Sequence, residues 1–107
     1  MASTREYLEF ILEQLSDLSD ISYRQMMGEY IIYCQGKIIG GIYDNRFLIK
    51  PTKTAKLKMP NGVFEKPYEN AKEMLLIDNV ENREFLNDLL NSVIDELPKP
   101  KKRRNIK

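Results

Sequence analysis

The segment from residue 24 to residue 50 constrains the fold more than any other part of this chain. It reads RQMMGEYIIYCQGKIIGGIYDNRFLIK, and two turn signals, Gln35-Gly36 and Asp44-Asn45, divide it into short apolar pieces. Such dipeptides favour two-residue hairpin loops, because Gly, Asn and Asp tolerate positive φ angles. We therefore predict an antiparallel meander with strands at 29–34, 37–43 and 46–50, preceded by a strand at 21–27.

The register of this meander follows if both turns are two-residue loops. Tyr33 should then pair with Ile38, and Ile42 with Phe47. The face expected beneath the helices carries Ile31, Tyr33, Ile38, Gly40, Ile42, Phe47 and Ile49.

The opposite face of the meander is mixed, yet too apolar for a fully solvated surface. Five residues there form a candidate partner-binding patch: Tyr30, Ile32, Ile39, Tyr43 and Leu48. A lone monomer would leave this patch exposed, so we expect either a protein partner or a homodimer that pairs the patch with itself.

Helices are expected before and after the meander in the sequence. Ser3 and Glu6 have the spacing of a capping box, which predicts a helix starting at Ser3 with an apolar stripe. A short helix should run from Thr52 to Lys58. A final amphipathic helix should begin at a cap supplied by Asn79 or Asn82.

These elements predict an α+β fold of order α-β-β-β-β-α-β-α. Residues 59–70 should form a loop, and 72–78 a further strand. Grouped strands flanked by helices favour an antiparallel sheet of about five strands with helices on one face.

Charge is distributed unevenly along the chain. Residues 98–107 carry six basic side chains and no acidic one, whereas residues 1–97 carry 11 basic and 16 acidic side chains, a net charge of −5. We therefore expect an acidic domain at 1–97 and a basic, flexible tail at 98–107. The candidate polyanion-binding residues are Lys101, Lys102, Arg103 and Arg104. Nucleic-acid binding through them should be weak and sequence-independent.

The sequence offers little to build a catalytic or metal site. It contains no histidine and a single cysteine, Cys34, which removes the commonest general base and any thiolate metal cluster. Cys34 lies within an apolar strand, which favours a structural thiol. We expect no cofactor, no metal and no enzymatic activity, with a small carboxylate-dependent enzyme as the remaining catalytic alternative.

No apolar run approaches the ~20 residues that a membrane helix needs. The start of the chain lacks the features of a signal peptide, and one cysteine suits a reducing compartment. These observations favour a cytoplasmic protein with no membrane partner.

The chain resembles the TfoX N-terminal domain family, whose members share a segment like R-x-M-F-G-G-x-G-I-Y followed by a glycine turn and an Asp-Asp or Asp-Asn turn. The matching residues are Met26, Met27, Gly28, Tyr33, Gly36, Ile42, Asp44, Asn45, Phe47, Leu48 and Lys50, with Arg24 near the family's arginine. Glu29 and Ile31 replace frequent glycines. The resemblance spans roughly residues 5 to 97.

This resemblance implies an α+β fold similar to the type III secretion chaperones. Full-length relatives add a helical C-terminal domain and act as positive regulators of competence genes together with a cyclic-AMP-dependent activator. The present chain resembles the stand-alone members. The leading expectation is a non-enzymatic regulatory or protein-interaction module, such as a transcriptional co-regulator. The main alternative is a nucleic-acid-associated protein that uses the basic tail.

Overall fold

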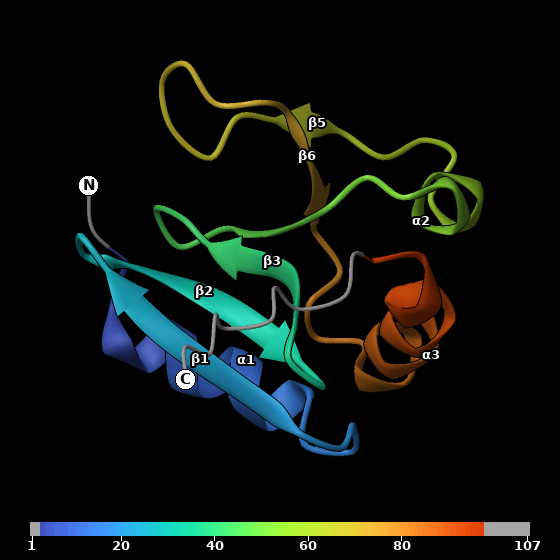
Figure 1. Cartoon of the computed structure of the whole chain (residues 1–107), viewed down its shortest axis with the longest axis horizontal. Helices are drawn as coiled ribbons and strands as arrows, with labels where there is room; N and C mark the ends of the chain where they lie inside the picture. Colours follow the sequence, from blue (N-terminus) through green and yellow to red (C-terminus); the bar gives the residue numbers. More distant parts are fainter. Residues whose placement is uncertain (1–2, 98–107) are drawn as a thin grey trace, which may run out of the picture.

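A six-stranded antiparallel sheet, with helices packed against one face, forms the framework of the computed structural model, which describes residues 3–97 (Figure 1). The helices are α1 (Arg5–Gln14), α2 (Lys53–Lys58) and α3 (Arg83–Val93), the last followed by a 3-10 turn at Ile94–Glu96. The strands are β1 (Ile21–Met26), β2 (Glu29–Cys34), β3 (Lys37–Ile42), β4 (Phe47–Ile49), β5 (Phe64–Glu65) and β6 (Met74–Ile77). Their spatial order is β1-β2-β3-β4-β6-β5. The predicted α+β class and antiparallel sheet are confirmed.

The hairpin turns have the backbone geometry that their residues favour. Gln35-Gly36 and Asp44-Asn45 both adopt positive φ at the two central positions, as does Met27-Gly28 between β1 and β2. This is the conformation of two-residue turns that match the twist of the flanking strands. The predicted turns therefore form, and Met27 lies at the tip of a third one.

The N-terminal cap of α1 differs from the prediction, whereas the caps of the other two helices agree with it. Thr4, and not Ser3, caps α1, since its side chain accepts a hydrogen bond from the backbone N–H of Tyr7. Asn82 caps α3 and Thr52 caps α2 in the same manner. Ser3 instead donates its hydroxyl proton to Glu29, 2.6 Å away, so a contact distant in sequence takes the residue away from the capping role.

Because of a β-bulge in β3, the observed pairing of β2 and β3 differs from the predicted register. Tyr33 pairs with Ile38 as expected, but the register then shifts and Ile32 pairs with Gly40. Ile39 is therefore an extra residue on β3, and the alternation of faces is reversed beyond it. Ile42 and Phe47 still pair as predicted.

The bulge moves residues of β2 and β3 from one face of the sheet to the other. Tyr30, Ile32 and Ile39 belong to the core beneath the helices. Ile38, which we expected to be buried there, is 38% exposed. The predicted face assignment is therefore wrong for this part of the meander and correct for Phe47 and Ile49, which lie in the core.

The core is continuous from the helices to the sheet. It includes Leu8 and Ile11 from α1 and Leu15 directly after it, Ala55 from α2, Leu86, Leu89, Leu90 and Val93 from α3, and Ile42, Phe47, Ile49, Leu75 and Ile77 from the sheet. The opposite sheet face has no helix packed on it in residues 3–97. This open face is where a functional site can be sought.

Candidate interaction groove on the open sheet face

The partner-binding patch predicted from the sequence does not form as an exposed surface. Its members Tyr30, Ile32, Ile39 and Leu48 are only 4%, 0%, 1% and 0% exposed. The bulge accounts for the first three, which face the helices. Leu48 pairs with Gly41 and Leu76 on the face opposite the core, and it is buried there as well. Only Tyr43 remains accessible, and the expected dimer through this patch loses its basis.

The candidate polyanion-binding residues Lys101, Lys102, Arg103 and Arg104 lie outside the described residues. The same is true of the whole segment 98–107 predicted as a basic tail.

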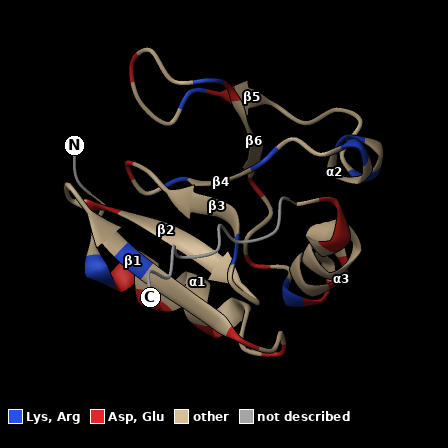
Figure 2. Cartoon of the chain, viewed as in Figure 1, with Lys and Arg blue, Asp and Glu red and all other residues tan. Residues whose placement is uncertain are grey.

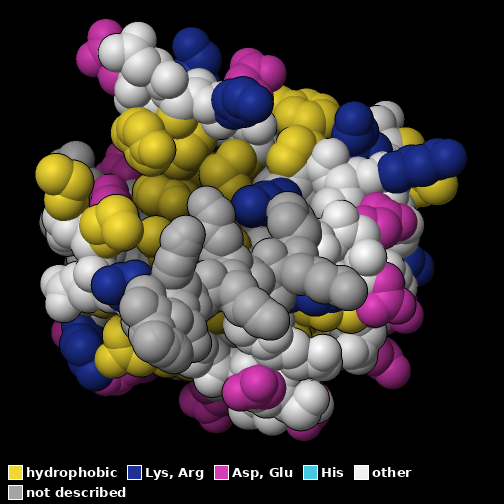
Figure 3. Space-filling view, in the orientation of Figure 1, with side chains coloured by type: hydrophobic (Ala, Val, Ile, Leu, Met, Phe, Trp, Pro, Cys, Tyr) yellow, Lys and Arg dark blue, Asp and Glu magenta, His cyan; other side chains and the backbone are white. Residues whose placement is uncertain are grey.

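Two adjoining hollows on the open face share Tyr43 and Tyr68. The first has a volume of about 590 Å³, and the second about 490 Å³. We call them together the open-face groove. Besides the two tyrosines, the first hollow is lined by Lys50, Pro51, Pro67, Asn70, Ala71, Lys72, Glu73 and Met74, and the second by Met26, Met27, Glu29 and Ile31. In Figure 3 hydrophobic side chains gather on this face, with basic side chains beside them.

The middle of the groove is an aromatic pair. The rings of Tyr43 and Tyr68 are tilted by 57° with centroids 6.2 Å apart. Tyr43 lies against Gly41, where an added Cβ would come within 2.7 Å of the tyrosine ring. Burial raises the pKa of the Tyr43 hydroxyl, and the neighbouring Tyr68 and Glu29 raise it further. Like any tyrosine at physiological pH, Tyr43 carries a protonated hydroxyl that can donate a hydrogen bond, and the raised pKa extends this to more alkaline conditions.

Arg46 holds the loop between β5 and β6 beside the sheet. Its guanidinium forms an ion pair with Glu65 and donates a hydrogen bond to the carbonyl oxygen of Lys66 at 3.3 Å. Its Nε also donates to the carbonyl oxygen of Tyr43 at 3.1 Å. One side chain thus connects the β3–β4 turn to the loop, which positions Tyr68 over Tyr43.

Glu29 fixes the other end of the groove. Its carboxylate accepts hydrogen bonds from the backbone N–H and hydroxyl of Ser3, at 3.1 and 2.6 Å, and from the N–H of Asp44 at 3.2 Å. Asn45 adds a bond to the N–H of Thr4 at 2.9 Å. These contacts tie the start of α1 to two hairpin turns and occupy the Glu29 carboxylate, so its role is structural.

Beyond this network the β1–β2 hairpin ends in exposed methionines. Met27 is 96% exposed, and Met26 next to it is also exposed. Methionine is flexible and polarisable, and it is common at surfaces that bind partners of variable shape. Sequence reasoning did not select Met26, Met27, Tyr68 or Lys72 as site residues, although the Met-Met pair directly before a glycine turn marks an exposed hairpin tip.

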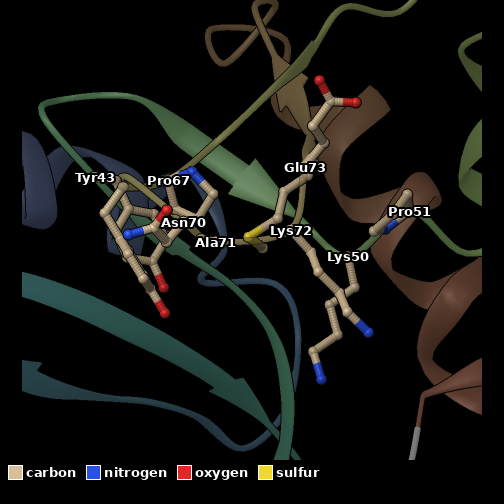
Figure 4. Close-up of a pocket in the computed structure, with 10 residues that line it drawn as sticks. Tyr43, Lys50, Pro51, Pro67, Asn70, Ala71, Lys72 and Glu73 are labelled. Carbon is tan, nitrogen blue, oxygen red and sulfur yellow. The ribbon is translucent and has the colours of Figure 1, made fainter.

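The cationic end of the groove contains two lysines. Lys50 follows β4 and Lys72 precedes β6, and in Figure 4 their ammonium groups extend to the same side, whereas the carboxylate of Glu73 points away. Within residues 3–97 neither ammonium group forms a hydrogen bond or an ion pair. The groove therefore combines an apolar end, an aromatic centre and a positively charged end.

The part of the chain that the structure describes contains no group of three or more His, Cys, Asp or Glu placed to hold a metal ion. Within residues 3–97 there is also no helix of the length and apolar character required to span a membrane.

Cys34 should react slowly with thiol reagents in the folded protein. It is buried, and its Sγ–H donates to the carbonyl oxygen of Ser19 at 3.6 Å. Burial raises the pKa of the thiol, nearby Asp20 raises it further, and Lys37 opposes them. Since the thiolate is the reactive form, we expect labelling by a disulfide reagent at pH 8 to be on the order of 100-fold slower than in denaturant. A native rate close to that of free cysteine would contradict this burial.

Comparison with known proteins gives one informative match. The chain is 33% identical over 105 residues to an "Uncharacterized 12.7 kDa protein in trpE 5'region" of Spirochaeta aurantia, covering 97% of this chain and 91% of that protein. No family model matches the chain, and no solved structure matches it.

Proposed function

The chain belongs to the family of the Spirochaeta aurantia protein, and from the geometry of the open-face groove we propose that it is a non-enzymatic protein-interaction module. The observation that carries this proposal is the pair of adjoining hollows that share Tyr43 and Tyr68, one of which is also lined by the exposed methionines of the β1–β2 hairpin. Aromatic and methionine side chains are enriched at protein interfaces, and exposed apolar patches mark interaction sites.

The rigidity of the groove supports the same function. The Arg46 contacts and the Glu29 network fix its two walls in the unbound protein. A preformed surface binds at a lower entropic cost than one that must become ordered.

The resemblance to the TfoX N-terminal domain suggests in which cellular process the module acts. We propose that the module acts in regulation, as a transcriptional co-regulator that binds another protein and does not itself contact a promoter. The net charge of −5 over residues 1–97 supports this division, because an acidic body is repelled by DNA.

Site-specific photo-crosslinking tests the interaction role. A benzoylphenylalanine at position 27 should give discrete adducts in cells that express the protein, because this side chain extends from the rim of the groove. The matched control places the same probe at Glu13, an exposed position on α1, which packs against the other sheet face. We expect adducts at least about tenfold more abundant from position 27, as expected for a hot-spot region compared with a bare surface.

A competition experiment tests whether the adducts form at the groove. An excess of the wild-type chain should suppress the adducts, whereas an excess of the Tyr68→Asp variant should not, because a charge in the aromatic centre of the groove disfavours an apolar partner. Equal adducts from positions 27 and 13, or none from either, would contradict the proposed function.

A further inference from the structure

We propose that the partner of the open-face groove contributes an acidic segment bearing an aromatic residue, whose carboxylates are bound by Lys50 and Lys72. This inference rests on the proposed function and adds the chemistry of the partner to it. The aromatic residue would occupy the first hollow, beside Tyr43 and above Met74.

The two lysines are brought together by strand pairing. β4 and β6 are antiparallel neighbours with Ile49 opposite Leu75. Lys50 is one residue beyond β4 and Lys72 is two residues before β6, so both lie at the same end of the same strand pair. Their ammonium groups extend to one side (Figure 4), and a carboxylate placed there would interact with both.

Among residues 3–97 the side chains of Lys50 and Lys72 have no hydrogen-bond or ion-pair partner, and both line the first hollow. The same lack of a partner is found for Arg24, Lys53, Lys56 and Lys66, which do not line the groove. Lys58 is paired with Asp88 at 3.1 Å, and Arg46 is paired with Glu65. Lys37 donates to the carbonyl oxygen of Ile94 at 3.0 Å. Two adjacent like charges without a counterion repel each other, and an acidic partner would remove that repulsion.

The charge pattern of the domain would direct such a partner to this end of the groove. Figure 2 shows basic residues on α2 and at the end of β4, both basic and acidic residues in the β5–β6 loop, and several acidic residues along α1 and α3, each of which also has a basic residue at its start. An acidic segment would be repelled by the helical side and attracted to the open face. Tyr43 lines both hollows, and its phenol hydroxyl is protonated at physiological pH, as in any ordinary tyrosine, so it can donate a hydrogen bond to a carboxylate.

The size of the groove favours a peptide segment over a small anion. The two hollows of about 590 and 490 Å³ together reach the upper end of the range typical of small-molecule sites, roughly 300–1,000 Å³. They share Tyr43 and Tyr68, and the lysines line one of them while the hairpin methionines line the other. An extended segment would fill both, with its acidic part at Lys72 and its apolar part near Met26.

Binding of synthetic copolymers to the full chain tests the inference. The probes are poly(Glu,Tyr), which is acidic and aromatic, poly-Glu, which is only acidic, and poly(Lys,Tyr), which is aromatic and basic. We expect poly(Glu,Tyr) to bind more tightly than either of the others. The double variant Lys50→Gln/Lys72→Gln should weaken this binding by about tenfold, since each exposed charge pair contributes a few-fold in affinity.

The matched control is Lys53→Gln/Lys56→Gln. It removes the same charge from two exposed lysines of α2 that do not line the groove, and it should change the affinity by less than about twofold. Residues 98–107 can also attract polyanions through their six cations, but they are identical in all variants, so the difference between the two double variants reports the groove alone. Melting temperatures would confirm that both variants are folded.

Equal losses in the two double variants, or no preference for poly(Glu,Tyr) over poly-Glu, would overturn the inference. If crosslinks form from position 27 while Lys50→Gln/Lys72→Gln binds the copolymer like the wild type, the interaction module stands and the acidic partner is wrong. If the crosslinks are absent as well, the proposed function fails with it.

Discussion

Replacing Gly40 by alanine is expected to destabilise the domain by about 3 kcal/mol or more. Gly40 pairs with Ile49 on β4, and a Cβ added to it would lie well inside contact distance of the carbonyl oxygen of Leu48 and 2.7 Å from the Cα of Ile49. Both are backbone atoms of a central strand, so no rotamer change can relieve the overlap. Urea unfolding of the full chain, followed by far-UV circular dichroism, measures the loss.

Gly62→Ala is the matched control for this substitution. A Cβ at Gly62 would meet the Cδ1 of Leu75 at 2.7 Å, which is the end of a side chain that can rotate, and the carbonyl oxygen of Met59 at 3.1 Å. We expect a loss below about 1.5 kcal/mol. A Gly40→Ala variant as stable as the wild type, or no less stable than Gly62→Ala, would show that β3 and β4 do not approach each other this closely.

The turns of the meander could be predicted from the sequence, whereas the bulge in β3 could not. Turn dipeptides act locally, so Gln35-Gly36 and Asp44-Asn45 could be assigned from their own conformational preferences. The register next to each turn followed directly. A bulge, in contrast, depends on how a third strand packs, and the consecutive apolar residues Ile38 and Ile39 give no alternation from which to choose a face.

Long-range contacts account for the other differences. Both Ser3 and Thr4 can cap a helix, and the choice depends on Glu29, which is distant in sequence and binds Ser3. The strand β5 has only two residues, too few for any periodic signal. Its position is set by antiparallel pairing with β6, with Phe64 opposite Leu75 and Glu65 opposite Met74, and by the ion pair between Glu65 and Arg46, neither of which a local pattern indicates.

The candidate groove was missed for the same physical reason. Its walls come from the β1–β2 hairpin, the β3–β4 hairpin and the β5–β6 loop, which become neighbours only when the sheet is assembled. The sequence did identify an apolar surplus on the meander, and the patch predicted from it includes Tyr43, which is half-buried in the structure. It could not show that the bulge buries Tyr30, Ile32 and Ile39 while leaving Tyr43 beside Tyr68.

Introducing aspartate at position 39 should have a much larger effect than introducing it at position 38. Ile39 is 1% exposed and lies in the core, so Ile39→Asp would bury a carboxylate without a partner and should cost more than about 4 kcal/mol of stability. Ile38 is its neighbour in sequence but faces the open side and is partly exposed. Ile38→Asp should therefore cost less than about 1.5 kcal/mol.

This pair of variants distinguishes the bulged register from a regular one, because a regular alternation would place Ile38 in the core and Ile39 on the open face and would reverse the two effects.

Acid titration of the two variants gives a second measurement. Burial would raise the pKa of the new carboxyl in the folded state, so the penalty of Ile39→Asp should decrease as the pH falls towards about 4, where the unfolded chain also becomes protonated. The stability of Ile38→Asp relative to the wild type should change little over the same range, because an exposed carboxylate titrates almost alike in both states. A larger loss from Ile38→Asp than from Ile39→Asp would mean that β3 is not bulged, and the face carrying the groove would have to be reassigned.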